Sequence, residues 1–214
     1  MKKFILPMVA ACAVASSVMG QTVTLNSGAY SFGVGGEFNA TLHSAPFTPV
    51  ALTNSGSFET FCLERSENFQ PGNTYHFTVD SVALLGGGGS IGGMDPLGET
   101  TAFLYGAFIN GTLAGYDYGN GSGMRAANAG ALQNAIWYLE QEVGSLDSAE
   151  AVAFYNFAQG GIGQGLGMVR VLNLFHYNDH GHRVHNQSQI FMLPTPGTIV
   201  LAGLAAGMII RRRR

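Results

Sequence analysis

The chain has 214 residues, of which 46% are hydrophobic and 11% charged, and its formal net charge is −3. Four of its ten lysines and arginines form the C-terminal run Arg211 to Arg214, so little basic charge remains for a folded surface. This composition excludes a nucleic-acid-binding protein, which needs clustered basic residues, and its length suits one domain with a full hydrophobic core.

Residues 1–20 have the three parts of a secretory signal peptide. Two lysines precede an apolar run, residues 4–14, and small residues up to Gly20 permit cleavage before Gln21. The segment VAAC, which ends at Cys12, also resembles a lipoprotein box, although the apolar core before it would then be very short. We therefore expect an exported protein whose single remaining cysteine is Cys62.

The first half of the domain reads as β-strands. Apolar and polar residues alternate in short runs that Gly, Ser, Asn and Pro separate, which predicts strands over residues 21–26, 29–36, 37–43, 47–54, 57–64 and 73–85. A glycine-rich segment, Gly86 to Gly93, follows them. It lacks the Gly-Lys-Ser/Thr ending of a phosphate-binding loop, so we interpret it as a connector.

Helical patterns come next, and each begins near a residue suited to the N-cap. Asp95 is the predicted cap of a helix over residues 97–113, with Pro96 in its first position. Asn128 is the predicted cap of a helix over 129–143, and Asp147 that of a helix over 149–159. Two strand-like runs around a polar turn, 167–177 and 185–193, close the domain. This order predicts an α+β fold with an antiparallel β-rich first half, a small helical subdomain and a closing β-hairpin.

Residues 193–214 form a second candidate signal. Pro194-Thr195-Pro196 precedes an apolar run, residues 198–210, and the four arginines. The run is shorter than the roughly 20 residues that span a bilayer, so it predicts a transient inner-membrane anchor with its arginines on the cytoplasmic side. The segment LPTPG also resembles a sortase site, but Pro196 stands where the attacked threonine would be.

This three-part tail resembles the PEP-CTERM sorting signal, with Pro-Thr-Pro in place of the usual Pro-Glu-Pro. The resemblance implies that an exosortase-like membrane protease recognises the proline motif and releases or transfers the protein outside the cell, often alongside exopolysaccharide. The expected location is therefore the cell envelope, cell surface or extracellular matrix of a bacterium.

The domain between the two signals, residues 21–192, contains two short motifs that belong together in one family. Phe61-Cys62 in a predicted strand and LQNAIW, residues 132–137, in a predicted helix resemble the thioester domain of Gram-positive surface adhesins. In that family a cysteine sulfur and a glutamine side-chain carbonyl form an internal thioester, which implies a bond between Cys62 and Gln133 here. The family commonly has threonine before the glutamine, and this chain has Leu132.

The residue types suit that chemistry. A thiolate attacks a primary carboxamide and ammonia leaves when the groups are held in contact, and backbone N–H groups can polarise the carbonyl. Trp137 follows Gln133 by four residues on the same helical face, so we expect it to shield the bond from hydrolysis. The predicted function is single-use covalent adhesion to an amine- or hydroxyl-bearing surface or polysaccharide, without enzymatic turnover, catalytic residues or a cofactor.

Other interpretations stay open. The alternative function is a non-covalent structural or carbohydrate-binding matrix protein in which Cys62 is buried and inert, and a disulfide-linked dimer through Cys62 is a further possibility. The candidate sites outside the cysteine and glutamine motifs are a histidine-rich hairpin that either binds a metal or forms a solvated turn, and a group of scattered carboxylates of unknown separation. Their residues are His176, Asp179, His180, His182 and His185 for the hairpin, and Glu59, Glu64 and Glu67 for the carboxylates.

Overall fold

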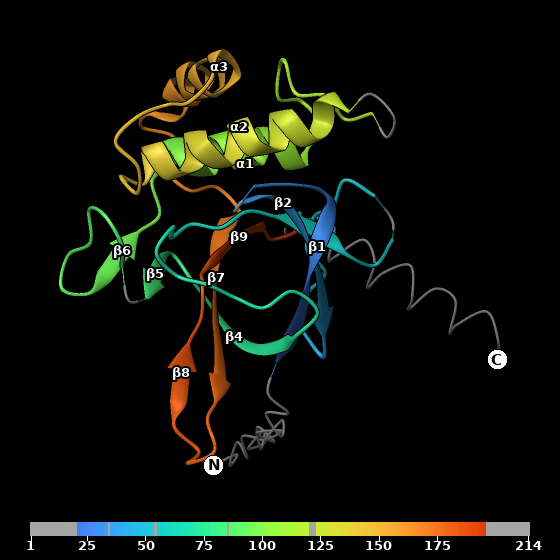
Figure 1. The fold of residues 1–214 in the computed structure, drawn as a ribbon, viewed down its shortest axis with the longest axis vertical. Coiled ribbons are helices and arrows are strands. Elements are labelled where there is room, and N and C mark those ends of the chain that lie inside the picture. Colours follow the sequence, from blue (N-terminus) through green and yellow to red (C-terminus); the bar gives the residue numbers. More distant parts are fainter. Residues whose placement is uncertain (1–20, 34, 54, 85, 120–122, 196–214) are drawn as a thin grey trace, which may run out of the picture.

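The computed structural model describes residues 21–33, 35–53, 55–84, 86–119 and 123–195. The predicted signal peptide lies outside these ranges, as does the predicted sorting tail after Thr195. Within the described ranges, no helix has both the length and the hydropathy needed to span a bilayer. The predicted α+β class is confirmed, since an antiparallel sheet, a group of helices and a closing strand hairpin make up the domain (Figure 1).

The main sheet is antiparallel throughout the described chain, with the strand order β3-β2-β1-β4-β7-β8. Strand β9 also pairs with β7, beside the segment of β7 that precedes the β8 pairing. The bounds are β1 Thr22–Phe32, β2 Gly35–His43, β3 Phe58–Thr60, β4 Thr74–Asp80, β7 Val169–Tyr177, β8 Arg183–His185 and β9 Gln189–Met192. Two short strands, β5 Val82–Leu84 and β6 Met94–Pro96, pair separately.

The sheet curls until its two ends meet. Just after β3, the Leu63 N–H donates to the Ser188 carbonyl at 3.0 Å, and the Ile190 N–H donates to the Phe61 carbonyl at 3.0 Å. Between these bonds Cys62 forms an antiparallel bridge with Gln189. Cys62 therefore lies on a seam, defined here as residues 61–63 paired with residues 188–190, where the first half of the domain meets its last strand.

Alternation along the strands separates two hydrophobic cores. On β7, Leu172 and Leu174 point into the curled sheet beside Leu25 and Phe77, whereas Val171 joins the core beneath the helices. Each buried leucine or valine contributes about 1.5–3 kcal/mol when it leaves water, so strand register is fixed by both faces.

The helices gather over one end of the sheet (Figure 1). They are α1 Glu99–Ile109, α2 Met124–Leu139 and α3 Ala149–Ala158, and a 3-10 turn, Gln159–Gly161, follows α3. Helix α2 packs against β1 and β2 on one side and against α3 on the other. Its buried residues include Leu132, Ala135 and Ile136, which lie in the predicted helical segment 129–143.

The helix starts differ from the predicted ones. Asp95 and Pro96 lie in β6, because residues 94–96 pair with β5, and α1 begins only at Glu99. Asn128 lies inside α2, which begins after Gly123, and its side chain accepts instead from the Asp117 N–H at 2.9 Å. For α3 the cap is Ser148, one residue beyond the predicted Asp147, and its hydroxyl accepts from the Ala151 N–H at 3.1 Å.

Several strand predictions were also wrong in detail. The run 73–85 was predicted as one strand, but it is divided between β4 in the main sheet and β5 in the separate pair. Residues 21–26 and 29–36 were expected to be separate strands, but β1 runs unbroken from Thr22 to Phe32. Residues 47–53 form no strand, because Pro49 cannot donate to a ladder. That segment is held instead by contacts such as the Val50 N–H donating to the Met192 carbonyl at 2.9 Å.

Candidate functional site

Cys62 and Gln133 contact each other where the seam meets α2. The Cys62 N–H donates to Gln133 Oε1 at 3.0 Å, and Gln133 Nε2 donates to the Cys62 carbonyl at 2.8 Å. Cys62 is 0% and Gln133 1% exposed. Two hydrogen bonds thus hold a primary carboxamide, with its carbonyl oxygen polarised by an N–H, against the residue that carries the thiol.

Among the described residues, the sulfur of Cys62 accepts a hydrogen bond from Gln189, which the sequence patterns did not reveal. Gln189 Nε2 donates to Cys62 Sγ at 3.4 Å, and Gln189 Oε1 accepts from the Thr60 hydroxyl at 3.4 Å. Burial raises the pKa of the Cys62 thiol to about 12, and the bond from Gln189 only partly offsets this. A free thiol here stays protonated at neutral pH. The sequence feature that could have marked Gln189 is the polar run of residues 187–189 at the start of the apolar β9, and the structure buries all three.

Trp137 packs directly on this pair. It forms a small buried cluster with Cys62 and Phe38, and Phe69 and Val143 pack against that cluster. In the described part of the chain, Trp137 Nε1 has no hydrogen-bond partner, so the ring acts here through its area. The indole therefore separates the Cys62 side of the pair from water.

The approach of β2 to α2 depends on a glycine. A Cβ at Gly35 would lie 2.5 Å from Gln133 Cγ and 2.9 Å from Trp137 Cη2, closer than real Cβ atoms come to other heavy atoms. Only glycine lets the strand lie this near both side chains. The Gly-Gly pair at the start of β2 was visible in the sequence, but its partner helix was not.

A cleft leads to the glutamine. It has a volume of about 770 Å³, and its lining includes Gly35, Arg65, Gln133, Trp137 and Glu150. Cys62 does not line it. A small nucleophile in this cleft would meet the Gln133 side chain, while the sulfur stays covered.

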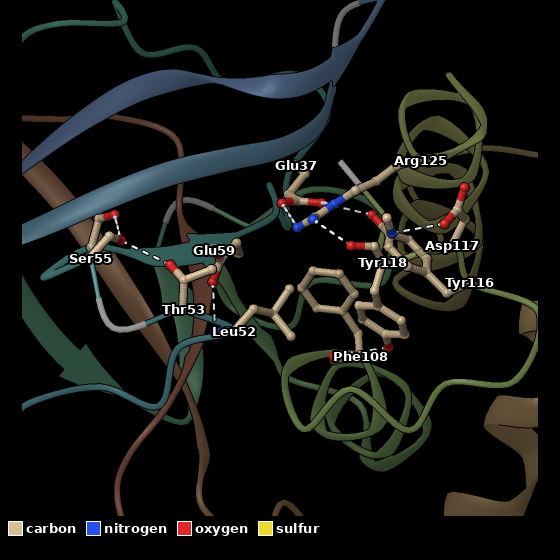
Figure 2. Close-up of polar contacts among 12 residues, drawn as sticks. Glu37, Leu52, Thr53, Ser55, Glu59, Phe108, Tyr116, Asp117, Tyr118 and Arg125 are labelled. Carbon is tan, nitrogen blue, oxygen red and sulfur yellow. Dashed lines mark hydrogen bonds and ion pairs between the residues drawn. The ribbon is translucent and has the colours of Figure 1, made fainter. Parts of the chain in front are cut away.

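A buried ion pair fixes the start of α2 on β2. Arg125 Nη2 donates to Glu37 Oε1 at 2.6 Å and Arg125 Nε donates to Glu37 Oε2 at 3.0 Å, while the Tyr116 hydroxyl donates to Glu37 Oε2 at 2.8 Å. Figure 2 shows Arg125 reaching from its helix toward Glu37 beside Tyr116 and Tyr118. The pair holds in place the helix that carries Gln133.

The histidine hairpin does not gather into a metal site. Its histidines are exposed or half-buried on β7, β8 and the turn between them, and His176 Nδ1 lies 2.8 Å from Asn186 Oδ1. Among the described residues, the carboxylate, thiol and imidazole ligand atoms that group within 4.8 Å of one another belong to Glu64, Asp95 and Glu142.

The three glutamates named from the sequence have different surroundings. Glu59 accepts from the Leu52 N–H at 2.9 Å, as Figure 2 shows, and burial raises the pKa of its carboxyl. Glu64 lies with Asp95 and Glu142, and Glu67 is not in that group. Burial is the largest cause of the raised pKa of Glu64, but the charge of Glu67 contributes as well, so these two carboxylates lie near each other.

Comparison with protein-family models, with curated proteins and with solved structures gave no match. The possible chemistry of the site therefore follows from the groups that it contains. A thiol, a primary carboxamide, an N–H on the carboxamide oxygen and a covering indole are together the components of an acyl transfer from the amide to sulfur.

Proposed function

We propose that the protein attaches covalently to amine- or hydroxyl-bearing targets through an internal thioester between Cys62 and Gln133. The observation that supports this is the pair of hydrogen bonds that joins the Gln133 carboxamide to the Cys62 backbone. To form the bond, Cys62 Sγ attacks Gln133 Cδ, the Cδ–Nε2 bond breaks, and the thiol proton leaves with the nitrogen as ammonia.

Attachment then consumes the thioester once. The amine or hydroxyl of the target attacks Gln133 Cδ from the cleft, the carbon–sulfur bond breaks, and Cys62 recovers a proton. The target keeps the Gln133 acyl group as an amide or an ester. Trp137 slows the competing attack by water because it covers the sulfur side of the bond.

The test is the mass of the full chain and its reaction with methylamine. Untreated protein should be lighter than its sequence by one ammonia, and methylamine should add to Gln133 while a thiol appears at Cys62. Cys62→Ala and Gln133→Ala should each abolish labelling. Gln164→Ala, which removes an exposed glutamine outside the site, should label as the unmutated chain does.

One alternative has its own support. The complete burial of Cys62 and its raised thiol pKa also suit an inert cysteine in a non-covalent structural or carbohydrate-binding matrix protein. Such a protein would show the full mass of free cysteine and glutamine and would gain no amine. That result, or labelling that survives Cys62→Ala, would replace the thioester with this second function.

We also propose that the chain is exported and sorted to the envelope, surface or matrix of a bacterial cell. The support is the signal-peptide pattern of residues 1–20 and the resemblance of residues 193–214 to a PEP-CTERM tail. The expected partner is an exosortase-like protease, with transient anchoring in the inner membrane.

A further inference from the structure

Three carboxylates from separate segments converge beside the seam. Glu64 lies two residues after Cys62, Asp95 lies in β6, and Glu142 follows α2. One oxygen from each lies within 4.8 Å of the others. The chain has folded so that three acidic side chains, far apart in sequence, face the same point.

Two of these carboxylates are buried with an oxygen that has no partner. Glu64 is 1% exposed and Asp95 7% exposed, and neither Glu64 Oε2 nor Asp95 Oδ2 has a hydrogen-bond partner among the described residues. None of the three carboxylates forms a salt bridge within the described chain. Buried carboxylates without donors or counter-charge are costly, so the arrangement lacks a positive charge.

The unpartnered oxygen of Glu64 points into a space shared with Glu142. A Cβ at Gly87 would overlap both Glu64 Oε2 and Glu142 Oε1, so only a glycine lets this segment pack against the two oxygens. Two backbone N–H groups orient the Glu142 carboxylate. The Gly88 N–H donates to its Oε1, and the Arg65 N–H donates to its Oε2 at 2.9 Å. The group is therefore oriented by backbone contacts rather than loosely clustered.

We propose that Glu64, Asp95 and Glu142 bind one hard divalent cation, and that Ca²⁺ fits the site best. Oxygens up to 4.8 Å apart can lie on opposite sides of an ion that coordinates at about 2.3–2.6 Å. Mg²⁺ needs near-octahedral oxygens at about 2.0–2.1 Å, and Zn²⁺ prefers nitrogen and sulfur ligands, which this group does not offer.

Three carboxylates at this separation repel one another. A proton shared between Glu64 and Glu142 is the competing way to reduce the repulsion. The two arrangements respond oppositely to added Ca²⁺.

The cation would join the two halves of the candidate thioester. Glu64 belongs to the segment of Cys62, and Glu142 lies just beyond the helix that carries Gln133. A bound ion would hold these segments together whether or not the thioester forms. Cation binding is therefore measured in both the unmutated chain and the Cys62→Ala chain, so that failure of one proposal is distinct from failure of the other.

The experiment titrates chelator-treated full chain with CaCl2 and, separately, with MgCl2, by calorimetry and thermal unfolding. We expect one Ca²⁺ per chain with a Kd of about 10⁻⁴–10⁻³ M, a range common in extracellular modules, and weaker binding of Mg²⁺. Ca²⁺ should raise the unfolding midpoint in both backgrounds. Glu64→Gln and Glu142→Gln should each weaken binding about tenfold or more, and Asp80→Asn, at an exposed carboxylate on β4, should not.

Glu64→Gln separates the cation from the shared proton. Under the cation proposal, this variant unfolds at a higher temperature than the unmutated chain without Ca²⁺, because repulsion is relieved, but its midpoint rises less than that of the unmutated chain when Ca²⁺ is added. The Ca²⁺ concentration for this test is about tenfold above the expected Kd. The proposal is wrong, and a shared proton replaces it, if the unmutated chain shows neither binding heat nor a shift in the unfolding midpoint. A Ca²⁺ response that persists in the Glu64→Gln/Glu142→Gln double variant also overturns it.

Discussion

At the scale of single residues, the site depends on Gly35, which has no side chain. Gly35 brings the β2 backbone against Gln133 and Trp137, and any side chain there would compete with the carboxamide for its place. The hydrogen bonds between Gln133 and Cys62 leave little freedom to relax, because both residues are buried. Gly35 therefore positions the two groups that the proposed thioester would join.

Gly35→Ala should impair the thioester while leaving a folded protein. The added methyl displaces Gln133, and misplacement of about 1 Å can cost about 10²-fold in rate, so we expect a smaller fraction of chains lighter by one ammonia and slower methylamine labelling. Gly144→Ala is the matched control, because a Cβ there meets no atom within 4 Å. A folded Gly35→Ala chain that labels like the unmutated one would show that the site tolerates the shift.

At the scale of elements, α2 is placed by a buried charge pair as well as by apolar packing. Arg125 lies at the start of the helix and reaches Glu37 on β2, and Tyr116 adds a third contact from the loop before α2. Burial raises the pKa of the Tyr116 hydroxyl, so it stays a donor to Glu37. Because Gln133 lies on the same helix, its position over Cys62 depends on this anchor.

Arg125→Met should lower the free energy of unfolding by about 3–5 kcal/mol, because Glu37 is left as a buried charge without its partner. Urea denaturation measures the loss. The double variant Arg125→Met/Glu37→Leu should recover much of the stability, since apolar residues often replace a buried pair without cost. Arg183→Met, which loses only an exposed contact with the Phe175 ring, should cost about 0.5–1 kcal/mol. Equal losses for the two single variants would contradict the anchoring role.

At the scale of the whole molecule, the domain is closed by its last strand. The seam pairs residues 61–63 with residues 188–190, so the backbone around Cys62 is complete only when β9 is in place. Strand β9 ends at Met192, one residue before the Pro-Thr-Pro motif, and the Leu193 N–H between them donates to the Met168 carbonyl at 2.9 Å. The predicted sorting signal therefore begins where the folded domain ends.

Deletion of Thr195 to Arg214 should move the protein from the envelope or matrix fraction into the free medium, because the proposed recognition tail is removed. The fold should persist, since the deletion begins after β9. Cell fractionation measures the change, and the mass of the truncated chain shows whether the Cys62 site still forms. An unchanged distribution would count against the sorting proposal.

The sequence by itself determined the features that repeat locally or lie within one short segment. Alternating residues predicted most strands, helical spacing predicted where α1, α2 and α3 lie, and two motifs marked Cys62 and Gln133 as a candidate pair. These signals are local because a strand or helix buries one face of its own residues. The same reasoning placed the helix starts incorrectly, because pairing of β5 with β6 engaged Asp95 before it could act as a cap.

Only the tertiary structure decided which distant residues meet. Gln189, on the last strand, donates to the Cys62 sulfur, and Gly35 allows β2 to pack closely against α2. Arg125 forms its ion pair with Glu37. The carboxylates of Glu64, Asp95 and Glu142 lie within 4.8 Å of one another. Each of these contacts joins segments tens of residues apart, so no periodicity within a segment encodes them. They follow from how the sheet curls and where the helices pack, which is decided by the summed burial of the whole domain.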